Sequence, residues 1–402
     1  MKLTGSALTV AALALASLVA LLWSPVERSD ASSAGPGVAA LAAPFIAGGV
    51  CLSRATPDQL DTLFDTEPGG VAGADYQRAT ELPNGNVLWT FQDAEVRRPD
   101  GTLTLVHNIG VMQTGSCFSV LMTGNAWDPK PWLFSEDTQQ FQNWYWPLDT
   151  VIGDDGRTYI FVAEMNESGE SYLTKVAPTA TRIAALDIEN WNIVLQGAPP
   201  NSSPELYGWT AESDNEWTYL YTHCYRQYGF DDIFGVAAHD LDCADQVTVA
   251  RVAKGRVFDP LEYWTGTGWA PNPASAVAVI ETAERLVNPS DIIHRNNQWL
   301  AVTKVNDWFG HEILVEASSR PTGPFEQIAN IPAEPKCGSN ICNTYYASWI
   351  PTADQQQQLT IGLSHNRWDG VFSGIYRPTY MSFETPEYEA SPADRCSIGQ
   401  CD

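Results

Sequence analysis

The chain has 402 residues, of which 48 are acidic and 22 are basic, so its formal net charge is −26 at pH 7. Such a charge excludes a nucleic-acid-binding protein, because phosphate binding needs clustered Lys and Arg. Hydrophobic residues make up 44% of the chain, which supports a packed core and excludes wholesale disorder. The fifteen Trp, fifteen Tyr and fourteen Phe are more than packing alone explains, and they indicate a cleft that stacks on sugars or other ligands.

The N-terminus has the pattern of an export signal. Lys2 precedes an apolar stretch over residues 7–23, and small residues follow at 31–34. This order is typical of a secretory signal peptide. The apolar stretch also reaches the lower length limit of a transmembrane helix, so an uncleaved anchor is the alternative. We expect a secreted or extracellular protein, anchored at the cell surface and in contact with the membrane only if the segment is not cleaved.

The eight cysteines predict disulfides, because their number is even and the chain is expected to be exported. Short loop closures favour Cys337–Cys342, Cys396–Cys401 and Cys224–Cys243, which leaves Cys51–Cys117. Other pairings stay open, since connectivity does not follow from spacing alone. The chain contains no CxxC pair, so we expect no zinc.

Five short segments downstream of residue 50 have the composition of β-strands, and a turn signal precedes each of them. They are residues 86–91, 157–165, 217–223, 298–304 and 359–365. The best helical candidate is short, over residues 274–286. Repeated hairpins with unequal insertions predict an all-β fold, a five-bladed β-propeller with four-stranded blades around a central channel. A large β-sandwich is the alternative.

Four sequence segments carry a resemblance to a known family. They are GADYQRATELPNGNVLWTFQDAEV at 73–96, WYWPLD at 144–149, LYGW at 206–209 and SSRPTGPFE at 318–326. This series resembles the five-bladed-propeller glycoside hydrolases, and among them the actinobacterial endo-D-arabinanase family, long catalogued as a domain of unknown function. The resemblance covers about residues 70–383. It implies hydrolysis of D-arabinofuranosyl linkages in cell-wall arabinan.

The resemblance also implies an organisation and a partner. We expect a signal peptide or anchor at 1–34, an Ala/Gly/Pro linker at 35–50, the catalytic propeller at 51–385 and a tail at 386–402. The implied partner is a polysaccharide substrate, and we expect a monomer. A non-catalytic carbohydrate-binding or surface-interaction propeller would have the same fold, so it remains the alternative function.

Two acidic residues of the opening hairpin are catalytic in the family that the chain resembles, and they match Asp75 and Asp93. Antiparallel pairing across the turn at 83–85 would bring both residues to one edge of the blade. Glycoside hydrolysis needs one proton-loaded carboxyl and one ionised carboxyl at such a position. We expect Asp75 as nucleophile or base and Asp93 as general acid, although either Asp could instead cap a turn.

Further residues are candidates for substrate binding because they end strands or supply aromatic faces. They are Asn108, Trp144, Trp146, Asp149, Tyr207, Trp209, His365 and Asn366. Trp144 and Trp146 face the same way in a strand, so they form either a sugar platform or part of the core. Asp149 either tunes the pKa of the pair by like-charge repulsion, binds a hydroxyl or starts a strand.

An acidic stretch at 229–246 holds five Asp, whose oxygen atoms suit calcium. It lacks the regular spacing of an EF-hand, so a solvated loop is the simpler interpretation. We therefore expect no cofactor and no metal at the site, with calcium as an open alternative. The chain also lacks the Gly-x-Ser-x-Gly, His-Glu-x-x-His and phosphate-loop motifs of other enzyme classes.

Overall fold

The computed structural model describes eleven segments of the chain. They are residues 45–133, 143–167, 176–189, 191–197, 206–222, 246–281, 291–305, 310–333, 341–351, 358–368 and 374–384. Helical structure within these segments is limited to α2 (Pro57–Leu60), η1 (Pro68–Gly70) and η2 (Pro273–Ser275), and the rest of the regular structure is β-strand. The predicted all-β fold is therefore confirmed.

The strands form five large sheets and one small sheet, all antiparallel. The first sheet contains β3 (Arg78–Glu81), β4 (Val87–Phe91), β7 (Ile109–Thr114), β8 (Cys117–Asn125), β1 (Phe45–Cys51) and β9 (Asp128–Lys130). The second contains β10 (Asn143–Ile152), β11 (Thr158–Glu167), β12 (Val176–Leu186) and β13 (Ile193–Gly197). The third contains β14 (Thr210–Ser213), β15 (Trp217–Tyr221), β16 (Gln246–Ala253), β17 (Glu262–Trp264), β18 (Trp269–Ala270) and β19 (Ala278–Glu281).

The fourth sheet contains β20 (Asp291–Arg295), β21 (Gln298–Val305), β22 (Glu312–Ser318) and β23 (Glu326–Pro332). The fifth contains β24 (Ile341–Ile350), β25 (Gln358–Trp368), β26 (Gly374–Tyr376) and β27 (Thr379–Glu384). The small sheet has the order β2 (Val71–Ala74), β5 (Ala94–Arg97) and β6 (Leu103–Val106).

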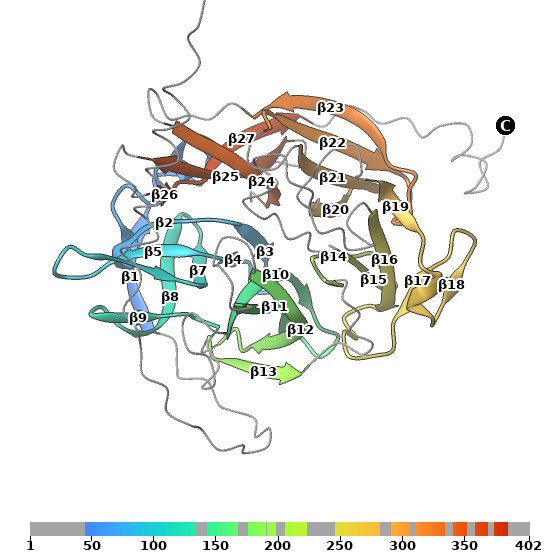
Figure 1. Cartoon of the computed structure of the whole chain (residues 1–402), viewed down its shortest axis with the longest axis horizontal. Coiled ribbons are helices and arrows are strands. Elements are labelled where there is room, and N and C mark those ends of the chain that lie inside the picture. The colour runs from blue at the N-terminus through green and yellow to red at the C-terminus, as the bar shows by residue number, and fades with distance from the viewer. Residues whose placement is uncertain are drawn as a thin grey trace, which may run out of the picture.

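The five large sheets are arranged in a ring. Their first strands contact one another in a closed circuit, from β3 to β10, β14, β20, β24 and back to β3. Figure 1 shows these strands around the centre of the molecule, with the later strands of each sheet further out. This is a β-propeller in which the five sheets are the blades. The five strands expected from the sequence are confirmed as β4, β11, β15, β21 and β25, the second strand of each blade.

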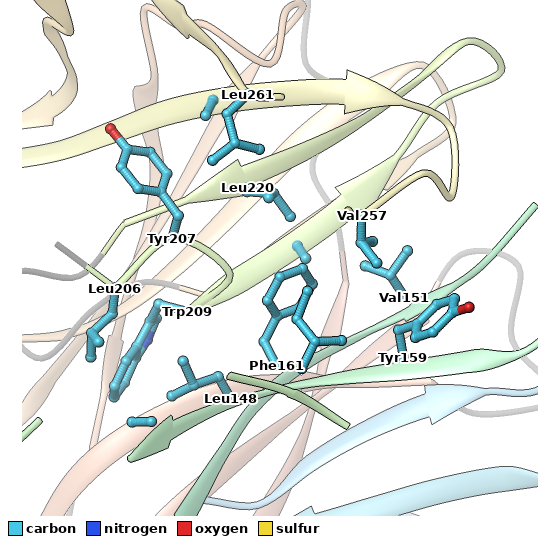
Figure 2. Close-up of a cluster of buried hydrophobic side chains, with 14 of the residues drawn as sticks. Leu148, Val151, Tyr159, Phe161, Leu206, Tyr207, Trp209, Leu220, Val257 and Leu261 are labelled. Carbon is cyan, nitrogen blue, oxygen red and sulfur yellow. The ribbon is translucent and has the colours of Figure 1, made fainter. Parts of the chain in front are cut away.

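Apolar side chains fill the spaces between neighbouring blades. Figure 2 shows the cluster between the second and third blades, where Leu148 and Phe161 face Trp209 and Leu220. Gly208 belongs to this contact, because a Cβ atom there would lie 2.4 Å from a ring carbon of Phe161 and its φ is +92°. The turn before β14 thus needs glycine so that the third blade can approach the second.

Two expectations about boundaries need correction. Residues 45–50, which we expected in the linker, belong to β1, because this apolar segment pairs with β8 along the edge of the first blade. The described part of the helical candidate, up to residue 281, is the end of η2 followed by β19, because the Val279 and Ile280 side chains are buried against the third blade. The signal segment at 1–34 and the tail at 386–402 lie outside the described residues. No helix in the described segments is long and apolar enough to cross a bilayer.

The disulfide Cys51–Cys117 is confirmed and joins β1 to β8, where the two residues are direct cross-strand neighbours. The pairings proposed for Cys224, Cys243, Cys337, Cys396 and Cys401 lie outside the described residues.

Removing this disulfide is expected to lower the stability of the propeller without disrupting its fold. The bond closes a loop with a sequence separation of 66, for which chain entropy gives a stabilisation of about 4 kcal/mol. The Cys51→Ala/Cys117→Ala double variant should therefore unfold at a lower denaturant concentration, with a free energy of unfolding about 2–4 kcal/mol smaller. Equal unfolding midpoints of the variant and the wild type would contradict this expectation.

Candidate active site

The small sheet brings the two predicted acids together. The last residue of β2 and the last residue of β6 both lie opposite Ala94, the first residue of β5. The next row across the sheet therefore contains Asp75, Asp93 and His107. The Asp75 backbone N–H donates to the Asp93 carbonyl at 2.9 Å, which continues the ladder by one residue. Opposed residues of an antiparallel ladder project their side chains to one face, so all three side chains meet there.

Asp93 is held through one of its two carboxylate oxygens. Its Oδ1 lies 3.0 Å from Nδ1 of His107 and accepts a hydrogen bond from Nε1 of Trp146 at 2.9 Å. Among the described residues, no hydrogen bond reaches Oδ2. Asp93 is buried, with 7% of its surface exposed. This carboxyl is thus fixed in orientation while one oxygen keeps its lone pairs available.

Asp75 is held through both oxygens. Its Oδ1 accepts the backbone N–H of Asp93 at 3.0 Å, and its Oδ2 accepts the phenol O–H of Tyr345 at 2.6 Å. Burial raises the pKa of Asp75 well above its usual value, and the negative charge of Asp93 raises it further, although both hydrogen bonds act in the opposite direction. Asp75 therefore retains its proton to a higher pH than an ordinary Asp side chain does.

A third carboxyl, Glu95, lies beside the pair. It is two residues beyond Asp93 in β5, so both side chains point to the same face of the sheet. Gly73 lies opposite Glu95 in β2 and leaves room for its side chain. Burial raises the pKa of Glu95 to about 7, and the charge of Asp93 contributes in the same direction. Its Oε2 is buried without a hydrogen-bond partner in the described segments.

Glu95 should make the stability of the protein depend on pH. Its folded-state pKa of about 7 exceeds the ordinary value of 4.5, so the folded state binds the extra proton and stability falls as pH rises from about 4.5 to 7. Glu95→Gln keeps the shape and removes this titration. At pH 8 the variant should exceed the wild type in free energy of unfolding by up to about 3 kcal/mol, with no difference near pH 4. Chemical denaturation at both pH values tests this, and identical pH dependence in the two proteins would contradict it.

An aromatic layer lies next to Asp75. Tyr76 adopts a left-handed backbone conformation, with φ of 48°, which is unusual for a bulky residue. Its backbone N–H donates to Oγ of Ser364 in the fifth blade at 2.8 Å. Its ring centroid lies 4.7 Å from that of Tyr346, 5.4 Å from Tyr345 and 6.5 Å from Trp209. The backbone turn that presents Asp75 is thus held by the fifth blade and by Trp209 at the start of the third.

Behind this layer, the channel contains a second group of charged residues. The Thr210 Oγ1 atom lies within hydrogen-bond distance of two carboxyls, 3.1 Å from Oδ2 of Asp149 and 3.0 Å from Oδ1 of Asp291. Asp149 also accepts a hydrogen bond from the Ala211 backbone N–H at 2.7 Å. Burial raises the pKa of Asp149 to about 6, and the charge of Asp291 adds to the effect. The charge of the Arg78 guanidinium opposes that rise. Asp149, Asp291 and Arg78 thus interact with one another and form a charged group of their own.

The cavity beside this group has a volume of about 500 Å³ and is lined by residues of all five innermost strands. Its lining begins at Arg78, Asp149 and Asp291 and continues toward the ends of those strands, away from Asp75. The charges that act on Asp75 are those of Asp93 and Glu95. Like-charge tuning of the acid pair was one of the roles considered for Asp149. In the structure, Glu95 is the residue placed to exert it.

The remaining predicted residues lie in different surroundings. Trp144 is buried and stacks on the ring of His107, with centroids 4.6 Å apart, while Trp146 binds Asp93. Asn108 fastens two blades, because its side chain bonds the Leu133 backbone and the Tyr145 carbonyl.

Tyr207 is part of the buried cluster, with its hydroxyl 2.9 Å from Thr248 Oγ1. Trp209 is buried with the Arg78 guanidinium over its ring. His365 and Asn366 are buried in β25. Trp146 thus bonds directly to the acid pair. The acidic stretch at 229–246 lies outside the described residues except for its last residue. Within the described segments, no group of three or more His, Cys, Asp or Glu could hold a metal ion.

Sequence reasoning did not assign roles to Tyr345, His107 and Glu95. Tyr345 is 270 positions from Asp75 in the chain, and only closure of the ring brings them together. His107 and Glu95 could have been found, because His107 ends the strand that follows Asp93 and Glu95 shares the face of Asp93. The alternation of side chains in a strand is the signal that identifies both.

A family described as a domain of unknown function, DUF5005, matches residues 58–387. The chain belongs to this family. The match contains all the residues of the acid pair and of the aromatic layer. No curated protein matches the sequence.

Solved structures with similar folds share little sequence with this member of the family. A Bacteroides ovatus protein described as a "putative hydrolase" has 17% identity and a TM-score of 0.58, over 77% of this chain and 85% of its own. A GH43_1 enzyme from Xanthomonas citri has 15% identity and a TM-score of 0.45, over 78% and 88%. A GH43 β-xylosidase/α-arabinofuranosidase from a compost metagenome has 12% identity and a TM-score of 0.45, over 79% and 92%. The first of these supports the fold.

Proposed function

We propose that the protein is a secreted glycoside hydrolase that cleaves D-arabinofuranosyl linkages of cell-wall arabinan, with Asp75 and Asp93 as its catalytic pair. One observation carries the proposal: two carboxyls lie side by side at the end of the small sheet, and their surroundings differ. Asp75 is buried against a neighbouring negative charge, which raises its pKa, while Asp93 accepts hydrogen bonds at one oxygen. A proton-loaded acid next to an acceptor carboxylate is the requirement of glycoside hydrolysis.

These surroundings support a definite order of roles. Asp75 is the general acid, and its proton resides on Oδ2, because Oδ1 faces the Asp93 backbone N–H. The Tyr345 hydroxyl donates to that same Oδ2 and stabilises the charge that develops when the proton leaves. Asp93 is the nucleophile or base. This order is the reverse of the one expected from the sequence, which contains no information on the burial of either carboxyl.

The sugar specificity rests on the resemblance of the segments at 73–96, 144–149 and 206–209 to the endo-D-arabinanase family. Their residues form the acid pair, the Trp146 contact and the aromatic layer. Export rests on the apolar segment at 7–23, and a mature protein recovered from the culture medium without that segment would support it.

Screening the purified mature protein against arabinogalactan, lipoarabinomannan, L-arabinan and galactan, with mass analysis of the products, tests the function. We expect oligosaccharides from the two D-arabinan-containing polymers and none from the other two. Cleavage of L-arabinan or galactan alone would refute the proposed sugar specificity but would leave the protein a glycoside hydrolase. Binding of a polymer without cleavage would refute the enzymatic function and would favour a carbohydrate-binding propeller.

A further inference from the structure

His107 occupies the third position in the row of side chains that contains the acid pair. It is fully buried, at 0% exposure, immediately after β6, and its Nδ1 lies 3.0 Å from Oδ1 of Asp93. The Trp144 ring stacks on the imidazole with an interplanar angle of 18°. Stacking fixes the plane of the imidazole and cross-strand pairing fixes its position, so the direction of Nδ1 is set by two independent packing contacts.

Two donors converge on the same oxygen of Asp93. The indole N–H of Trp146 can only donate, so Oδ1 acts as an acceptor in that contact. With Asp93 ionised, the contact at 3.0 Å is favourable only if Nδ1 of His107 also carries a hydrogen. Oδ2 receives no hydrogen bond in the described segments. The carboxylate is therefore asymmetric, with one oxygen engaged on the protein side and one oxygen available.

We propose that His107 is a positioning residue for hydrolysis, which donates from Nδ1 to Oδ1 of Asp93 and so makes Oδ2 the oxygen that meets the substrate. The proposal rests on the proposed function for its reaction and on the structure for its geometry. His107 acts through Asp93 and does not touch the sugar. The charged groups facing Asp93 are Asp75 from the end of β2 and Glu95 from β5, and both are negative when ionised. A donor at Oδ1 fixes the orientation of the Asp93 carboxyl beside these two acids.

The tautomer of His107 is measurable without any substrate. We expect a long-range ¹H–¹⁵N spectrum of the full protein, labelled at histidine, to show a hydrogen on Nδ1 of His107. The His107→Asn variant assigns the resonance by its disappearance. A hydrogen on Nε2 alone would overturn the proposal, because Nδ1 could then not donate to Asp93.

Activity measurements distinguish a positioning role of His107 from a role in packing alone. His107→Asn places an amide nitrogen near the Nδ1 position and should keep kcat within a few-fold of the wild type. His107→Leu removes the donor and should lower kcat about 10- to 100-fold with little change in KM, as expected for a hydrogen bond to a charged group.

His294→Leu is the matched control, since His294 makes the same kind of stack on Trp299, with centroids 4.6 Å apart, in the fourth blade. It should leave kcat unchanged. Equal losses in His107→Asn and His107→Leu would overturn the positioning role. A wild type that cleaves no furanoside would instead refute the proposed function. The tautomer measurement would still show whether Nδ1 of His107 donates to Asp93.

Discussion

Asp93→Asn is expected to abolish hydrolysis of D-arabinan while leaving the fold intact. The substitution keeps the size of the side chain and its acceptor oxygen, so the bonds from Trp146 and His107 can persist. It removes the nucleophilic or basic oxygen, and such help is worth roughly 10²–10⁴-fold. The rate should fall by at least this factor on the natural polymer and on an aryl arabinofuranoside alike, because both need the same attack.

The matching control is Asp128→Asn, an exposed carboxyl in β9 that pairs with Lys130 on the surface. It should retain wild-type turnover. Thermal unfolding and far-ultraviolet circular dichroism should be the same for the wild type and both variants. Near-wild-type turnover of a folded Asp93→Asn protein would remove Asp93 from the mechanism.

Asp75→Asn is expected to give a loss that depends on the leaving group. A general acid protonates the departing oxygen, so the loss on arabinan should be roughly 10²–10⁴-fold. An aryl glycoside with an acidic phenol leaves without full protonation, so the loss on that substrate should be much smaller. The contrast between the two substrates is what identifies the acid.

The pH profile gives a second test of the same role. Burial and the charge of Asp93 raise the pKa of Asp75, so its proton is retained to a pH well above the ordinary range of an Asp side chain. Wild-type kcat on arabinan should therefore fall at high pH, and Asp75→Asn should lack this alkaline limb on the aryl substrate. An equal loss of Asp75→Asn on both substrates, together with a leaving-group-dependent loss of Asp93→Asn, would exchange the two roles.

The sequence was sufficient for the parts of the structure that depend on local pattern. Alternating apolar residues bounded by turn signals located the second strand of every blade, and the hairpin argument placed Asp75 and Asp93 at one edge. Both inferences use only the pairing rules of neighbouring strands. They therefore needed no knowledge of how the blades pack against one another.

Roles that depend on contacts between blades did not follow from the sequence. Trp144 and Trp146 lie on one face of β10, as expected, yet Trp144 packs behind His107 and Trp146 bonds Asp93. Asn108 ends a strand, but its amide is engaged by the backbone of the next blade. The proton preference of the acid pair also depends on burial, which a linear pattern does not contain. For this reason the sequence left the order of acid and base open, and the order proposed above rests on the burial of Asp75.

The most direct test of the account compares the wild type with the Asp75→Asn/Asp93→Asn double variant on D-arabinan. Products are measured by mass spectrometry, and binding of the intact polymer is measured in parallel. The account predicts that both proteins bind the polymer and that only the wild type releases oligosaccharides. A wild type that binds without cleaving, or a double variant that cleaves as fast as the wild type, would contradict it.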